Sequence, residues 1–213
     1  LFSRYRPLAQ AARHSLFEGL KEYYQEEISH WRNALKDISL LRFRYLKRWR
    51  LAQIERMHYA LWLGGLRGYS DYFILVTDVR AAGDASTLNM VTNELRMTLG
   101  LCKQFGMEDA RLEPYLERDQ TFRKVEDLLR KDLSSAQKLL NEMSRDDLPL
   151  LLKAYWHYLY ALIGIRQGQR SMTTFRLNAP INISLKTALD NAEALNEPDL
   201  EEARQALLSY IYN

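Results

Sequence analysis

Hydrophobic residues recur at intervals of three and four along most of the chain, the spacing that is typical of amphipathic α-helices. N-capping residues and glycine or proline breaks separate one periodic segment from the next. The first begins at a capping box, in which Ser15 and Glu18 are spaced to bond each other's backbone N–H groups. The segments expected to be helical are approximately residues 15–36, 40–63, 87–105, 119–143, 148–168, 185–195 and 199–211.

Two segments fit more than one structure. The apolar run within residues 72–79 would suit a short buried strand, but no partner strand lies nearby, so a helix over residues 69–82 capped by Ser70 is preferred. Residues 169–183 form the longest irregular stretch. A small hairpin there would turn at Asn178-Ala179-Pro180 and would have only short strands.

The stretch 148–165 is apolar on nearly every side of a helix, and only Lys153, His157 and Gly164 share a strip without large apolar groups. Such a helix must be covered on most sides, by other helices or by lipid. Lys153 would be costly inside a membrane, and an acidic start at Asp146 suits the N-terminus of a water-soluble helix. We therefore predict an all-α, single-domain, irregular bundle of six to eight helices around this fully buried central helix.

No linker, low-complexity tract or fixed-period repeat divides the chain, so residues 1–213 are expected to form one helical domain. Residues 1–14 are basic and could instead be a lead-in arm. The chain begins at Leu1 without a methionine, which suggests a piece of a longer protein. A removed membrane anchor upstream of the basic lead-in is a second interpretation.

Composition agrees with a globular helical protein of 213 residues, with 47% hydrophobic and 27% charged residues. Nine glycines and five prolines are few for a turn-rich β fold. The single cysteine, Cys102, excludes an intramolecular disulfide and fits a reducing compartment. With no signal-peptide pattern, we expect a cytoplasmic location.

Charge is distributed unevenly along the chain. Residues 1–70 hold 13 Lys and Arg against 6 Asp and Glu, a net charge of +7, whereas residues 71–213 hold 17 against 21, a net charge of −4. The asymmetry suggests that the basic half meets a negative surface: a protein partner, nucleic acid, lipid headgroups or, as the default interpretation, its own acidic half.

The predicted helix 40–63 concentrates this positive charge between aromatic residues. Its cations are Arg42, Arg44, Lys47, Arg48, Arg50 and Arg56. Lys47 and Arg50 fall within the apolar sector, where a cation must extend to solvent or meet a carboxylate. The glutamates of the preceding helix, Glu22, Glu26 and Glu27, are candidate partners. The alternative is a face that binds anions, because guanidinium groups suit carboxylates and phosphates alike.

Signatures of catalysis are absent from the sequence, which has no nucleotide-binding glycine loop, no nucleophile elbow and no metal-ligand motif. The glycine-rich run Leu63–Gly68 follows a helix and is interpreted as a helix stop, and Cys102 as a small buried hydrophobe. Lys153 and His157 lie one turn apart and could line a polar pocket. A hydrogen-bonded core histidine is the simpler interpretation. We expect no enzyme activity, cofactor or metal.

These observations favour a non-enzymatic helical interaction or regulatory (adaptor) domain. Its basic helix would engage an acidic protein or peptide partner, or an anionic membrane surface. The alternative is a nucleic-acid-binding regulator that uses the same residues, although no named nucleic-acid-binding motif is visible. The 13 tyrosines leave a homo-oligomer interface open as well.

Overall fold

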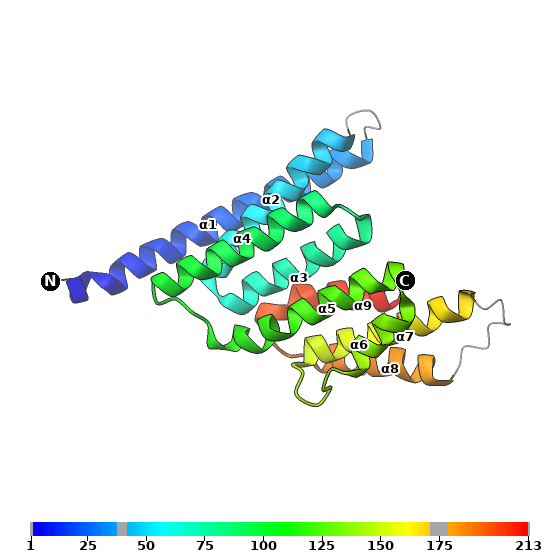
Figure 1. Ribbon diagram of the computed structural model, residues 1–213. Helices are drawn as coiled ribbons and strands as arrows, with labels where there is room; N and C mark the ends of the chain where they lie inside the picture. The colour runs from blue at the N-terminus through cyan, green and yellow to red at the C-terminus, as the bar shows by residue number, and fades with distance from the viewer. Residues whose placement is uncertain (1, 38–41, 171–178, 213) are drawn as a thin grey trace. The chain divides into compact units, whose positions relative to one another are not determined.

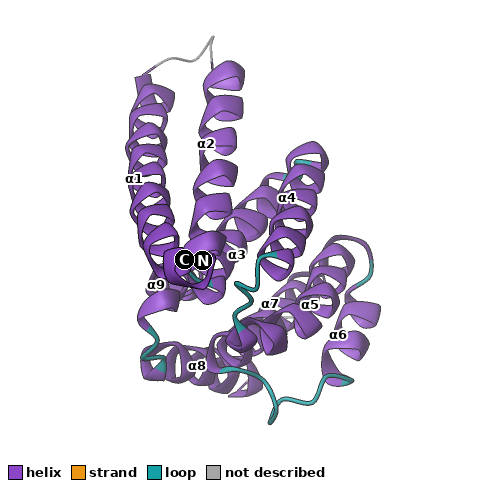
Figure 2. Cartoon of the chain, turned by 90° about the vertical axis from the view of Figure 1, so that its left-hand side faces the viewer, coloured by secondary structure: helices purple, strands orange, loops and turns teal. Residues whose placement is uncertain are grey.

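The computed structural model describes residues 2–37, 42–170 and 179–212, and the side chains of residues 11–34, 46–168 and 180–212. Within these ranges the chain forms helices and no strand (Figure 1, Figure 2), which confirms the all-α prediction. The α-helices are α1 (Phe2–Asp37), α2 (Arg42–Leu63), α3 (Gly65–Ala82), α4 (Ala85–Gln104), α5 (Glu113–Lys131), α6 (Leu133–Asn141), α7 (Leu150–Arg170), α8 (Ala179–Ala194) and α9 (Glu201–Tyr212). Two single-turn 3-10 helices, Ala110–Leu112 and Pro198–Leu200, precede α5 and α9.

The helices gather into two compact units, Leu1–Ala110 and Arg111–Asn213. The expectation of a single domain stays a prediction. Among the helices of the described ranges, none is both long and apolar enough to cross a membrane.

In the first unit α2 packs against α1, α3 and α4, and Figure 1 shows α1 and α2 running side by side. The most buried element is α3, where Tyr69, Phe73 and Val76 have no exposed surface. Burial on nearly all sides explains why its sequence resembled a buried strand, because an apolar run alone does not distinguish the two. The preference for a helix over residues 69–82 is confirmed.

Aromatic rings join α1 to α2. The ring centroid of Phe17 lies 5.8 Å from that of Tyr59 and 5.6 Å from that of Trp62, and Tyr24 stacks on Tyr59.

Helix α1 is continuous from Phe2, so the predicted start at Ser15 is wrong. Residues 8–14 include three alanines and neither glycine nor proline, so a helix can continue through the capping-box sequence.

In the second unit α7 is the central element, in contact with α5, α6, α8 and α9. Leu151, Ala154 and Ala161 have no exposed surface, and Tyr155 and Leu159 are almost fully buried. This confirms the central buried helix predicted from residues 148–165.

The described ranges hold one α-helix more than the predicted six to eight, because the segment expected as one helix over 119–143 is divided into α5 and α6. At Asp132 the backbone becomes extended, with φ −150° and ψ 97°. Its carboxylate accepts hydrogen bonds from the N–H groups of Ser134 and Ser135 at 3.0 and 3.2 Å. Aspartate is a favoured N-cap, and here the cap interrupts an otherwise continuous amphipathic pattern.

The hairpin considered for residues 169–183 is not formed, since its second strand, residues 181–185, lies inside α8. Its first strand, residues 173–177, lies outside the described residues. The helix expected to begin near residue 185 therefore starts earlier, at Ala179. Pro180 is well placed in the first helical turn, where its missing N–H has no helical partner to lose.

The turn between α2 and α3 depends on a close approach at Gly68. A Cβ atom at this position would lie 2.4 Å from Cγ and 2.6 Å from Cα of Leu61. Because one of these atoms belongs to the backbone of α2, the contact cannot be relieved by a side-chain rotation. The glycine-rich run Leu63–Gly68 is thus a helix stop, as predicted, and the structure shows that it is also the point where α2 and α3 cross closely.

We expect Gly68→Ala to lower the free energy of unfolding by about 2 kcal/mol, because the two helices must separate to admit the methyl group. The matched control is Gly100→Ala in α4, where a Cβ atom would meet nothing within 4 Å. The control should raise the free energy of unfolding by roughly 0.5–1 kcal/mol, as alanine is the better helix former. Urea unfolding followed by circular dichroism measures both, and equal effects of the two substitutions would contradict the close approach.

Candidate functional site

The cations of α2 whose side chains are described fall into two groups: two form ion pairs and are mostly buried, and two are exposed. Arg42 and Arg44 belong to α2, but they are not among the residues whose side chains are described. Arg50 and Arg56 are mostly buried, each with 12% of the side chain exposed. Lys47 and Arg48 are exposed.

Arg50 and Arg56 form ion pairs with aspartates of the following elements. Arg50 pairs with Asp84, and burial lowers the pKa of its guanidinium, partly opposed by the negative charge of Asp78. Arg56 pairs with Asp71 of α3 and also donates a hydrogen bond to Gln25 of α1. Asp84, rather than a predicted glutamate of α1, neutralises Arg50, whereas Lys47, the other cation predicted in the apolar sector, is exposed. Both arginines are therefore structural.

Asp84 has a second role at the start of α4. Its carboxylate accepts hydrogen bonds from the N–H of Thr87 at 3.0 Å and from the Thr87 hydroxyl at 2.6 Å. The same side chain thus caps α4 and binds Arg50 of α2. A substitution of Asp84 would therefore remove both the N-cap of α4 and the ion pair with Arg50 of α2.

The exposed cations have different surroundings. The guanidinium carbon of Arg48 lies 5.1 Å from the ring centroid of Trp31 on α1, within the range of a cation–π contact. Trp31 is itself oriented by a 2.8 Å hydrogen bond from Nε1 to Glu27. Among the described side chains, Lys47 and Arg48 have no carboxylate partner within salt-bridge distance. Their charge is available to a ligand.

A groove of about 370 Å³ lies between α2 and the start of α4. Four of its nine lining residues are apolar, three from α2 and one from α4, and Lys47, Arg50 and Asp84 are its charged members. The residues that line it are Leu46, Lys47, Arg50, Leu51, Ile54, Asp84, Ser86, Thr87 and Met90. Leu51 and Met90 are 37% and 42% exposed, which is high for large apolar residues. Two of the six predicted cations therefore lie at one apolar groove.

The second predicted site, Lys153 and His157, lies on a half-buried strip of α7. Burial lowers the pKa of His157, and the positive charges of Arg145 and Lys153 lower it further. Its Nδ1 is buried and has no hydrogen-bond partner among the described residues, so the expected hydrogen bond is not made at this atom.

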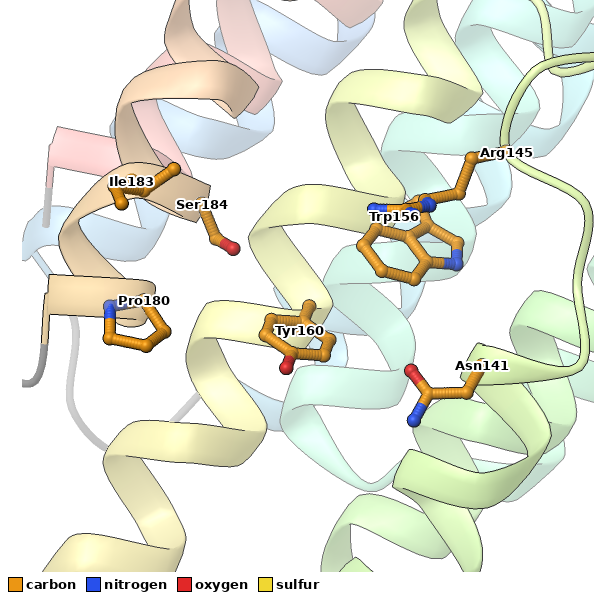
Figure 3. A pocket seen from close by; sticks show the side chains of 7 residues that line it. All are labelled: Asn141, Arg145, Trp156, Tyr160, Pro180, Ile183 and Ser184. Atoms are coloured by element: carbon orange, nitrogen blue, oxygen red, sulfur yellow. The ribbon is translucent and has the colours of Figure 1, made fainter.

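A pocket of about 510 Å³ lies beside this strip, and neither Lys153 nor His157 lines it. Its walls come from the end of α6, the connection to α7, α7 itself and the first turns of α8 (Figure 3). The lining residues are Asn141, Arg145, Trp156, Tyr160, Pro180, Ile183 and Ser184. The sequence analysis missed this site because its members come from four segments and share no motif.

The structure also assembles a histidine cluster that the sequence did not indicate. His58 Nδ1 lies 2.7 Å from Glu94 and 2.9 Å from Thr98, while Trp62 Nε1 donates to His58 Nε2 at 3.2 Å. Because Nε2 accepts from the indole, Nδ1 carries the proton and donates to the carboxylate. The cluster therefore joins α2 to α4. Both ring nitrogens of His58 already have hydrogen-bond partners, so neither is available as a general base.

The second unit contains a network of charged residues around Arg123 that the sequence did not indicate either. Arg123 binds Asp119 at 2.9 Å and Glu126 at 2.9 Å, and the Tyr155 hydroxyl donates to Glu126. Burial raises the pKa of Tyr155 well above its ordinary value, with a further contribution from Glu126. Asp119 lies within α5, where it pairs with Arg123 of the same helix, and the hydrogen bond between Tyr155 and Glu126 joins α5 to α7.

Within the described ranges no three His, Cys, Asp or Glu side chains are close enough to hold a metal ion. Comparisons of the chain with protein-family models, with curated protein sequences and with solved structures found no match.

The ion pair of Arg56 and Asp71 generates a stability prediction. Asp71→Leu leaves a guanidinium buried without its carboxylate and should lower the free energy of unfolding by about 3–5 kcal/mol. The double variant Arg56→Met/Asp71→Leu should recover most of this loss, since an apolar pair replaces the ionic one. Urea unfolding of the three chains measures the difference. A loss below about 1 kcal/mol in the single variant would contradict a structural role.

A second prediction concerns Cys102, whose thiol is buried and has its pKa raised to about 11 by that burial. At pH 8 only about one molecule in a thousand carries the thiolate that alkylating reagents attack. We expect iodoacetamide to leave the folded chain unmodified and to label it fully in urea, as measured by mass spectrometry. Rapid labelling without denaturant would show that the thiol is accessible.

Proposed function

We propose that this chain is a non-enzymatic helical interaction module that binds an acidic, amphipathic segment of a partner protein in the groove between α2 and α4. The observation that supports it is an apolar groove whose lining includes Lys47, a cation that forms no salt bridge with the described side chains. Helical peptides commonly bind such grooves through apolar anchors spaced along one face.

The apolar part of the groove supplies the affinity in this proposal. Leu46, Leu51, Ile54 and Met90 line it, and the side chains of Leu51 and Met90 are partly exposed. Methionine is unbranched and adapts to the shape of a bound side chain. A partner with leucine or similar residues at intervals of three and four would cover this surface.

Charge supplies the selectivity. Arg50 is neutralised by Asp84, so it contributes geometry more than net charge. Lys47 and, on the neighbouring exposed surface, Arg48 remain positive and favour carboxylates placed on the flanks of a bound segment. The net charge of +7 over residues 1–70, from 13 Lys and Arg against 6 Asp and Glu, would also attract an acidic partner before contact.

The test uses a labelled synthetic peptide of about 16 residues, with leucine on one helical face and glutamate on the others, and fluorescence anisotropy. Lys47→Glu and Met90→Glu should each weaken binding about tenfold or more, one by repulsion and the other by loss of an apolar contact. Lys103→Glu is the matched control, because Lys103 lies on α4 outside the groove and is 78% exposed. It should leave binding nearly unchanged.

The same experiment separates the other classes of partner. Duplex DNA, single-stranded RNA and vesicles containing anionic lipid are offered at several salt concentrations. Nucleic-acid binding weakens steeply and linearly on a log–log salt plot, whereas a partner held by apolar anchors keeps much of its affinity. The proposal fails if the peptide binds no better than a scrambled control, or if a nucleic acid or a vesicle binds more tightly through Lys47.

A further inference from the structure

The pocket of the second unit has the size of a small-molecule site. Its volume of about 510 Å³ falls within the range of known ligand pockets, roughly 300–1,000 Å³. Figure 3 shows Trp156 and Tyr160 of α7 between two groups of side chains: Pro180, Ile183 and Ser184 of α8 on one side, and Asn141 and Arg145 on the other.

The aromatic wall is held in place before any ligand arrives. Trp156 is buried and its Nε1 donates a 2.9 Å hydrogen bond to the carbonyl oxygen of Leu140. Tyr160 stacks on it with 5.2 Å between ring centroids and 13° between planes. The Arg145 guanidinium carbon lies 5.0 Å from the centroid of Trp156. The rings therefore need little reorganisation to pack against a flat or branched apolar group.

The opposite wall depends on the close packing of α7 and α8. A Cβ atom at Gly164 would lie 3.0 Å from the side chain of Ile181, so glycine lets α8 approach α7 here. Ile183 is 64% exposed, high for an isoleucine, and contributes apolar surface to the pocket. An apolar group between the rings and Ile183 would cover surface on both walls.

The polar groups of the pocket, Asn141, Arg145 and Ser184, can donate hydrogen bonds. Among the described residues, no side-chain hydrogen bond or ion pair involves Asn141, Arg145 or the hydroxyl of Ser184, although Ser184 is only 7% exposed. The lining contains one cation and no carboxylate. Burial is the main cause of the lowered pKa of the nearby His157, and the positive charges of Arg145 and Lys153 add to it.

A carboxylate suits these groups better than a phosphate does. One guanidinium fork matches the two oxygens of a carboxylate, and a hydroxyl and an amide can complete its hydrogen bonds. A phosphate site at the start of α8 would use backbone N–H groups, but Pro180 removes one from the first turn.

We propose that this pocket binds a small organic acid whose single carboxylate pairs with Arg145 and whose aromatic or branched aliphatic group packs between Tyr160 and Ile183. This site is independent of the groove between α2 and α4.

Phenylacetate and 4-methylpentanoate are the probes, titrated into the ¹⁵N-labelled full chain and followed by the indole N–H signal of Trp156. We expect saturable shifts with dissociation constants of about 0.1–1 mM, and at least tenfold weaker binding of phenylacetamide, which lacks the charge. Arg145→Met should weaken phenylacetate binding at least tenfold and leave the fold intact, because Arg145 is exposed. Arg118→Met, in α5 and outside the pocket lining, is the matched control and should bind as the parent chain does.

A short peptide that ends in phenylalanine with a free carboxylate distinguishes a free acid from a chain end, and tighter binding of either supports the carboxylate site. The proposal is overturned if neither acid gives saturable shifts below about 10 mM, if the amide binds as well as the acid, or if Arg145→Met binds unchanged.

Discussion

The first unit depends on the neutralisation of two arginines of α2 by aspartates that follow them in the chain. Arg56 meets Asp71 inside the buried α3, and Arg50 meets Asp84 at the start of α4. A charge removed from water must find an opposite charge or it destabilises the fold, so these pairs restrict how α2, α3 and α4 can pack. Asp84 links the constraint to the backbone, because it also accepts the hydrogen bonds that begin α4.

The ion pairs of Arg50 and Arg56 reduce the number of α2 cations that could bind a ligand. A helix with six positive side chains resembles a general anion-binding surface, but two of the four whose side chains are described are satisfied within the fold. Lys47 and Arg48 are left, one among the lining residues of an apolar groove and the other beside Trp31. A mixed surface of this kind suits a protein segment with both apolar and acidic residues better than a uniform row of phosphates.

Periodicity predicted most of the helices, because spacing of apolar residues is a local property that packing reinforces. It could not locate Asp132, where a capping carboxylate interrupts an amphipathic pattern that otherwise continues from α5 to α6. Nor could it choose Asp84 over the glutamates of α1 as the partner of Arg50, since that choice depends on how helices cross. The pocket around Trp156 could not be predicted from the sequence either, because helix packing brings its lining residues together from separate segments. Lys153 and His157 lie half-buried on α7, and neither is among the lining residues of the cavity beside them.

The central claim is that the arginines of α2 differ in accessibility, and the rate of arginine modification by phenylglyoxal, resolved by peptide mass spectrometry, tests it most directly. In the folded chain we predict that Arg48 reacts at least tenfold faster than Arg50 and Arg56, and that the three react alike in denaturant. Equal rates in the folded chain would contradict the account, because they would place all three guanidinium groups in the same surroundings.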